Sequence, residues 1–302
     1  MSIRDGRLTP EEIKKNTAAI DHVVVKSNLE CFQLSKGLRP GMLSIFLGPK
    51  GNGKSALCKT VSLDCMRSRV KCLHILSEEE SSLYKRKIAE SAEKYMGDKA
   101  DELLQYLLFD SMLEWSESQL TKSGFMKRLQ DLINEYLPDV ILFDNITTSF
   151  LSSLHISQQG AVIADLRRIA KESETVFVLV AHTAKSSDPY QKMLTGEDVR
   201  GTAETTNTSA YNYVLTTFFR LEKPRAFLFV DKARYHPDVN STYWELFYDQ
   251  ELGIYLKSEK RSYQEVKEVM NETSKGVPIK AYKDEIERLQ QIIAGGNYGK
   301  KN

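Results

Sequence analysis

Residues 48–55 read Gly-Pro-Lys-Gly-Asn-Gly-Lys-Ser, which satisfies the pattern GxxxxGK[ST] in full. The apolar run 42–47 stands directly before this segment, and a helix is predicted to follow over about 54–69. Gly51 and Gly53 allow backbone N–H groups to turn inward, and the helix points its N-terminus at the same spot. The segment therefore predicts a strand–loop–helix unit that surrounds phosphate groups. Its expected contacts are Gly48, Pro49, Lys50, Gly51, Asn52, Gly53, Lys54, Ser55 and Ala56.

Short apolar runs alternate with helical patterns as far as about residue 211. Buried strands separated by helices form a parallel sheet covered on both faces, so this alternation predicts an α/β fold. Beyond residue 211 closely spaced strand patterns predict antiparallel strands at one end of the sheet, and a charged helical tail follows over 262–293. The expected strands are 42–47, 71–76, 106–109, 139–144, 175–181, 213–219, 226–230, 242–248 and 253–256, and the expected helices are 10–23, 54–69, one from 81, 117–137 and 158–172.

The net charge is only +1 over 302 residues, so any nucleic-acid surface must be local. The four cysteines show no CxxC spacing, which predicts reduced thiols in the core. The N-terminus lacks an apolar signal segment, and no apolar run approaches the ~20 residues that cross a bilayer. We therefore expect a cytoplasmic protein without membrane contact.

Lys54 and Ser55 of the loop are expected to form a nucleotide site together with Asp144. Lys54 is predicted to reach the β- and γ-phosphates of ATP, and the Ser55 hydroxyl to bind Mg²⁺. Asp144 ends the apolar run 140–143, and carboxylates at the ends of parallel strands lie where such sheets bind ligands. Ser55 and Asp144 are thus the expected metal ligands.

Attack on a γ-phosphate needs a group that orients and deprotonates water. Three acids, Glu78 to Glu80, follow the strand 71–76 directly, and only one of them is expected to serve as the base. Glu79 is our first choice and Glu78 the second, while the remaining acids suit a helix N-terminus. His182 follows another strand at the equivalent place and is predicted to sense the γ-phosphate.

These motifs together resemble the RecA-fold core of DnaB-type hexameric helicases, including phage primase-helicases, over about residues 30–258. Four segments carry the resemblance: Gly37-Leu-Arg-Pro-Gly41 before the first strand, Ser77 to Ser81 with the glutamate, Asp198-Val-Arg-Gly-Thr202, and Lys232-Ala-Arg234. The resemblance implies a RecA-like P-loop core and favours Glu79. It also implies that Lys232 and Arg234 reach the γ-phosphate bound by the adjacent subunit, so that activity requires a ring, expected to be a hexamer.

The same resemblance divides the chain into an arm at 1–29, an ATPase domain at 30–258 and a charged helical tail at 259–302. The tail is a candidate contact for other replication proteins. Single-stranded DNA is the expected partner, held by Lys185, Lys192 and Arg200 of the loop 183–200. The other candidate DNA loop, 151–159, carries no Lys or Arg, and the glutamate segment departs from the replicative form.

Three functions remain open from the sequence. The first is a minimal ring helicase that moves on single-stranded DNA in a bacterial, phage or plasmid setting. The second is a RecA-fold ATPase of recombination, repair or circadian-clock-type regulation that is not a helicase. The third is an assembly protein that binds ATP to form rings and recruits partners through its tail.

Overall fold

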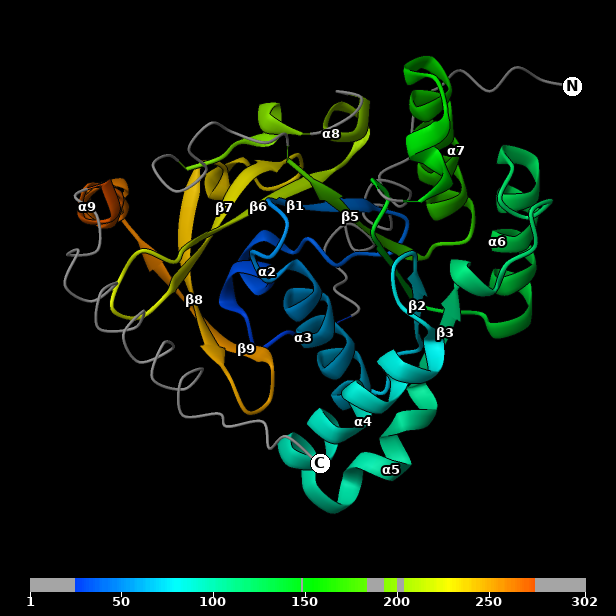
Figure 1. The fold of residues 1–302 in the computed structure, drawn as a ribbon, viewed down its shortest axis with the longest axis horizontal. Coiled ribbons are helices and arrows are strands. Elements are labelled where there is room, and N and C mark those ends of the chain that lie inside the picture. Colours follow the sequence, from blue (N-terminus) through cyan, green and yellow to red (C-terminus); the bar gives the residue numbers. More distant parts are fainter. Residues whose placement is uncertain (1–24, 148, 184–192, 200–203, 275–302) are drawn as a thin grey trace, which may run out of the picture.

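The computed structural model describes residues 25–147, 149–183, 193–199 and 204–274. These residues form one nine-stranded sheet in the order β3-β2-β4-β5-β1-β6-β7-β8-β9 (Figure 1). The strands from β3 to β6 run parallel to one another, and the pairs from β6 to β9 are antiparallel. The bounds are β1 Leu43–Gly48, β2 Cys72–Leu76, β3 Leu107–Ser111, β4 Val140–Asp144, β5 Val176–His182, β6 Tyr211–Phe218, β7 Arg225–Ala233, β8 Thr242–Asp249 and β9 Ile254–Arg261.

Helices cover both faces of the parallel part, as the near-continuous apolar strands require. On one face α3 and α4 bury Leu57, Val61 and Ile88 against the sheet, and on the other α6 and α7 bury Phe125 and Val162. Figure 1 shows these two layers on opposite sides of the strands. The helices are α2 Glu30–Ser35, α3 Lys54–Arg67, α4 Ser81–Met96, α5 Ala100–Leu103, α6 Lys122–Tyr136, α7 Ile156–Glu172, α8 Glu204–Thr208 and α9 Tyr263–Ser274.

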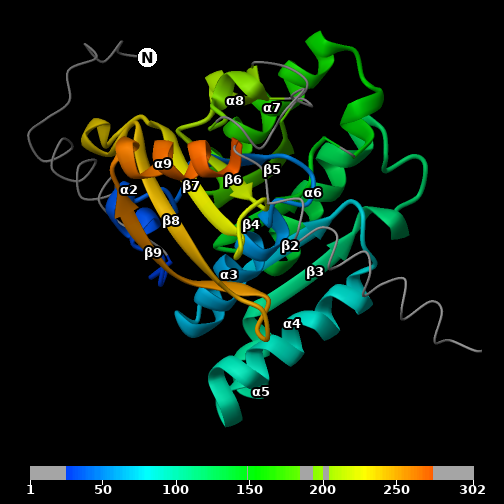
Figure 2. The same ribbon diagram turned by 60° about the vertical axis from the view of Figure 1, so that its left-hand side comes forward.

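The antiparallel end of the sheet curls around helix α3. The Tyr255 backbone N–H donates to Thr60 Oγ1 at 2.9 Å, and Lys59 Nζ donates to the Leu252 carbonyl at 3.1 Å. Figure 2 shows β8 and β9 bending past α3, while α9 lies across the other side of these strands. The curl matters for function because it brings residues from the last strands next to the phosphate loop.

The α/β architecture predicted from the sequence is confirmed, including the antiparallel strands at one end. The long amphipathic segment 117–137 is helical only from Lys122, because the Thr121 side chain accepts a hydrogen bond from Gly124 N and caps the helix there. The predicted helix over 10–23 lies outside the described residues. Of the expected tail 259–302, residues 259–261 continue strand β9, and the helix α9 follows.

The four cysteines are free and buried, as predicted. Among the described residues, no helix is both long enough and apolar enough to span a bilayer.

Candidate nucleotide site

The phosphate loop leaves β1 and enters α3 with its glycines in the left-handed region. The φ angles are +79° at Gly51 and +91° at Gly53, and a Cβ at Gly53 would also meet Tyr255 Oη at 2.2 Å. No side chain caps the N-terminus of α3, so its first N–H groups face the loop. The loop thus has the open, positively polarised cradle that an anion requires.

Lys54 lies inside this cradle. Its Nζ donates to the carbonyl oxygens of Gly48 at 2.9 Å and Pro49 at 2.7 Å, and the side chain is buried. Burial lowers the pKa of Lys54 to about 8, against the opposing effect of the Asp144 and Glu78 carboxylates. An arriving phosphate would favour the charged ammonium and offset this desolvation.

Asp144 ends β4 beside the start of α3. Burial raises the pKa of its carboxyl to about 6, and a hydrogen bond from Ser55 and the charge of Lys54 work against that rise. The structure therefore brings the two predicted metal ligands into direct contact. Hydroxyl and carboxylate oxygens are the ligands that Mg²⁺ prefers, and a cation there would relieve the burial of the carboxylate.

His182 ends β5 directly beside the loop, paired in register with Gly48. Its Nε2 lies 3.3 Å from Asn145 Nδ2, and its backbone N–H donates to Thr147 Oγ1 at 3.2 Å. Burial lowers the pKa of His182, and Lys54 adds to this effect while Glu78 opposes it. The neutral imidazole is therefore positioned between the loop and the residues that follow Asp144.

The three candidate acids occupy different positions. Glu80 is the N-cap residue of α4. Glu79 pairs with Lys87 of the same helix, and its carbonyl accepts from Ser111 Oγ at 2.8 Å. The Glu78 charge acts on Lys54, Asp144 and His182 together. Glu79 is therefore paired with α4 and acts only on Asp144 among these three groups, whereas Glu78 acts on all three.

Lys232 and Arg234 lie far from the phosphate loop of their own chain. Lys232 Nζ donates to the carbonyls of Thr206 at 3.0 Å and Asn207 at 2.9 Å, and Arg234 Nη2 donates to the Asn207 carbonyl at 3.3 Å. Both cations thus sit at the C-terminal end of α8, where the helix dipole favours positive charge. The predicted DNA contacts lie outside the described residues: Lys185, Lys192 and Arg200.

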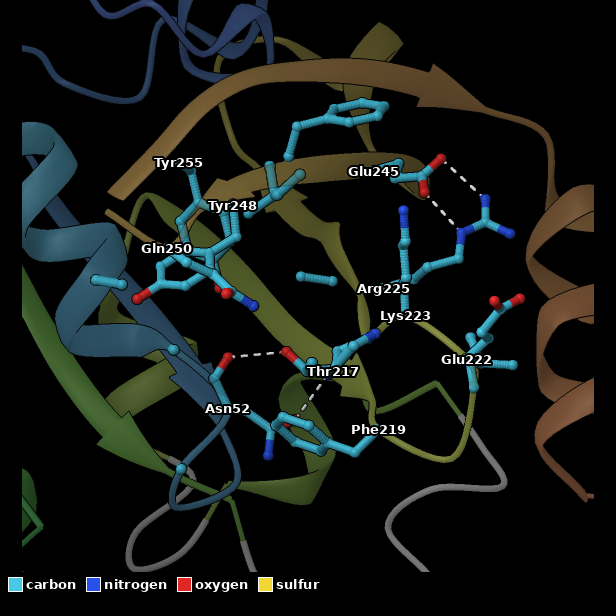
Figure 3. A pocket seen from close by; sticks show the side chains of 18 of the residues that line it. Asn52, Thr217, Phe219, Glu222, Lys223, Arg225, Glu245, Tyr248, Gln250 and Tyr255 are labelled. Atoms are coloured by element: carbon cyan, nitrogen blue, oxygen red, sulfur yellow. Dashed lines mark hydrogen bonds and ion pairs between the residues drawn. The ribbon is translucent and has the colours of Figure 1, made fainter. Parts of the chain in front are cut away.

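A pocket of about 1000 Å³ opens beside the loop, between Asn52 and the antiparallel strands (Figure 3). Thr217 of β6 ties the loop to this wall, since its backbone N–H donates to Asn52 Oδ1 at 2.7 Å and its Oγ1 to the Asn52 carbonyl at 2.9 Å. Aromatic and charged side chains line the remainder, among them Phe219, Lys223, Arg225, Glu245, Tyr248 and Tyr255.

Sequence reasoning missed this pocket because its lining residues come from the faces of antiparallel strands. Alternating aromatic and polar residues there look the same whether they line a pocket or a solvent surface. Asn145, which lies beside His182, was also missed. The sequence marked it only by its position directly after Asp144. The close approach of Tyr255 to Gly53 joins residues about 200 positions apart and left no local pattern.

Comparison with known proteins gives the family. The model of a family described as AAA domain matches residues 13–188, which is more than half of the chain. The chain belongs to this AAA-domain family. No curated protein matches the chain. Among solved structures, a KaiC-like protein from the hyperthermophilic archaeon Pyrococcus horikoshii OT3 is similar, with a TM-score of 0.58 and 13% identity over 78% of this chain and 99% of that one.

The structural likeness confirms the predicted RecA-like fold for this AAA domain. Family and fold together make the chain a RecA-fold P-loop protein of the AAA ATPase type, a family that generally binds ATP with Mg²⁺. The resemblance to DnaB-type helicases in particular stays a prediction.

Proposed function

We propose that the chain is an ATP hydrolase that works at the interfaces of a ring and uses the energy to move on single-stranded DNA. One observation carries the interface part of this proposal. The phosphate loop, the predicted metal ligands and the candidate base lie at the C-terminal ends of the parallel strands. Lys232 and Arg234 lie toward the N-terminal ends of these strands.

The separation follows from the register. Arg234 N donates to the Ala210 carbonyl, and Ala210 N donates to the carbonyl of Leu43, the first residue of β1. The phosphate loop begins at the other end of β1, at Gly48. Five residues of strand span roughly 16 Å, beyond the reach of an arginine side chain anchored on α8. This distance supports a role for the cation pair at a neighbouring subunit's nucleotide.

The proposed chemistry assigns one task to each group. Lys54 and the N–H groups of the loop bind the phosphates, and Ser55 and Asp144 would hold Mg²⁺, which supplies charge neutralisation when bound. A glutamate takes a proton from the attacking water. His182, with Asn145 beside it, detects whether the γ-phosphate is present.

We favour Glu78 as the base over Glu79. Two observations support this: the Glu78 charge acts on Lys54, Asp144 and His182, and Glu79 is engaged by Lys87. Glu78→Gln should reduce hydrolysis about 10²–10⁴-fold and leave ATP binding intact, whereas Glu79→Gln should cost only a few-fold. The reverse result would return the role to Glu79.

The pocket beside the loop suits the base and ribose of ATP. It adjoins Gly51 to Gly53, it is of the size that holds a small ligand, and Phe219 and Tyr248 offer aromatic faces for stacking. The phosphates would then lie in the loop while the base lies among the antiparallel strands.

The trans role is tested by mixing two inactive variants. Lys54→Ala and Arg234→Ala should each lose hydrolysis, and Arg234→Ala should still bind ATP. A mixed ring contains some interfaces with an intact lysine on one side and an intact arginine on the other, so mixing should restore part of the activity. Arg69→Ala, a surface arginine paired with Glu102, is the matched control. Full activity in Arg234→Ala alone would exclude the role.

The DNA part of the proposal rests on the helicase resemblance. The lack of any Lys or Arg in the loop 151–159 favours a second candidate, a RecA-fold ring ATPase that regulates other proteins without unwinding DNA. The KaiC-like neighbour is compatible with that candidate. Strand displacement on a forked duplex supports the helicase, whereas ATPase activity that DNA neither binds nor stimulates supports the second candidate.

A further inference from the structure

A second cluster of ligand-type side chains lies beneath the nucleotide site. Cys58 stands one helical turn after Lys54 on α3, His74 lies in the middle of β2, and Asp144 ends the neighbouring strand β4. One potential ligand atom from each residue lies within 4.8 Å of the other two. His74 is paired with Leu142, two residues before Asp144, so both side chains emerge on the face of the sheet that α3 covers.

The imidazole of His74 has no hydrogen-bond partner among the described residues. Both of its ring nitrogens are buried, and the residue is 1% exposed. Its neighbours are aromatic: the ring of Tyr84 lies edge-on at 4.7 Å between centroids, and Phe109 is stacked at 6.4 Å. Tyr84 Oη is likewise buried without a partner. Unpaired buried polar atoms are rare because each costs free energy, so this cluster calls for a bound species.

The chemistry of the three donors selects the species. A thiol, an imidazole and a carboxylate are the ligands of Zn²⁺ and similar cations, whereas Mg²⁺ takes oxygen ligands. The ring of His74, buried among aromatic side chains, offers an imidazole nitrogen that no other described group engages. The Cys58 thiol would release one proton to solvent as its sulfur binds.

We propose that Cys58, His74 and Asp144 form a binding site for one zinc-type divalent cation. Three protein ligands leave the fourth tetrahedral position for water or for a further group such as the Tyr84 hydroxyl. Asp144 is only partly buried and faces the nucleotide site, so the ion enters from that side. The site differs from the proposed Mg²⁺ site in its soft donors and shares one carboxylate with it.

The shared carboxylate makes the two sites compete. With Asp144 bound to the zinc-type ion, its carboxylate would be drawn away from Ser55 and would hold the Mg²⁺ of the nucleotide less well. The ion therefore inhibits hydrolysis. This second step rests on the proposed ATPase function, but binding of the ion does not.

Cobalt(II) titration of the nucleotide-free protein tests the binding itself, because a cysteine thiolate bound to Co²⁺ gives a charge-transfer absorption band. Wild type should bind one Co²⁺ per chain with this band, and Zn²⁺ should displace it. Cys58→Ser should abolish the band, and His74→Phe, which keeps a ring beside Tyr84 and Phe109, should weaken binding about 10–100-fold. Cys31→Ser removes another buried thiol and should leave the titration unchanged.

Absence of the band in the wild type would overturn the site. An unchanged band in Cys58→Ser would equally overturn it. Circular dichroism melting of each variant separates lost ligands from lost folding. The titration requires no nucleotide and no hydrolysis, so failure of the ATPase proposal leaves this measurement intact. If hydrolysis is present, Zn²⁺ should inhibit the wild type at least about tenfold more strongly than Cys58→Ser.

Discussion

The parallel and antiparallel parts of the sheet contribute to the candidate site in different ways. In the parallel part the chemical groups stand where strands end: Asp144 is the last residue of β4, His182 is the last residue of β5, and the phosphate loop begins at the end of β1. In the antiparallel part the pocket residues stand on strand faces or in a hairpin, as Tyr248 and Phe219 do. Strand ends are open to ligand and share one edge, so they suit catalysis, whereas a curled strand face offers shape and stacking surface.

Buried carboxyl groups in the two parts also respond to pH in opposite ways. Asp64 on α3 is buried, and this burial raises its pKa to about 6 despite hydrogen bonds from Ser27 and Asn28 and the charge of Arg67. Glu245 on β8 is buried too, which by itself would raise its pKa, but hydrogen bonds from Arg225 and Arg261 outweigh burial and lower it. The interactions of Asp64 do not offset the effect of its burial on the pKa, whereas the two arginines more than offset the burial of Glu245.

The strongest test of the parallel part is Lys54→Ala. The ammonium lies at the centre of the loop, so its loss should lower ATP hydrolysis at least about 10³-fold, equal to about 4 kcal/mol in the barrier. Steady-state phosphate release measures this. Lys99→Ala changes an exposed lysine beyond the end of α4, outside the phosphate loop, and serves as the control. Retained turnover in Lys54→Ala would remove the phosphate-loop assignment.

The ion pairs of the antiparallel part are tested by Glu245→Gln. Glu245 accepts from Arg225 at 2.7 and 2.9 Å and from Arg261 at 2.8 Å. The variant should lose about 2 kcal/mol of unfolding free energy at neutral pH, because Gln cannot form the two ion pairs. The loss is no larger because both arginines are partly exposed, so solvent screens the pairs. Since the folded pKa is lowered, this contribution is present above the ordinary value of 4.5 and vanishes as the pH falls below it. Urea unfolding that gives the same loss at low pH would contradict the pairing.

Asp64→Asn should show the opposite pH dependence. A raised folded pKa means that the wild type is favoured below pH 3.8 and loses this contribution as the pH rises through about 6. Relative to wild type, the variant should therefore gain about 2 kcal/mol between pH 4 and pH 7. Urea unfolding at both pH values measures the change, with exposed Asp98→Asn as the control. A difference in unfolding free energy that stays constant with pH would show that the pKa of Asp64 is not raised in the folded protein.

The smallest effect is expected from the pocket wall. Tyr248→Ala should raise KM for ATP about tenfold and leave kcat nearly unchanged, because stacking on the base is the same in the ground and transition states. Tyr263→Ala, an exposed aromatic on α9 outside the pocket, is the control. A loss in kcat instead would place Tyr248 in the chemistry and blur the division between the two parts of the sheet.

Much of the parallel part was predictable because its signals are local. An apolar run, a glycine loop and a helix start leave a pattern within twenty residues, and the polar residues that end strands lie next to that pattern. The proposed preference for Glu78 over Glu79 was not predictable, because it rests on the contact between Glu79 and Lys87 of α4. The cluster of Cys58 and His74 likewise looked like ordinary core positions.

By itself, the sequence determined the phosphate loop, the order of strands and helices along the chain, and the residues at the strand ends. Hydrophobic period and glycine conformational freedom act over a few residues, so these features need no tertiary information. The fold decided what lies beside them: Thr217 holds Asn52, Tyr255 packs on Gly53, and His74 faces Cys58. Those contacts come from the curl of the sheet and from the position of α3 against it, and both depend on the packing of the whole core.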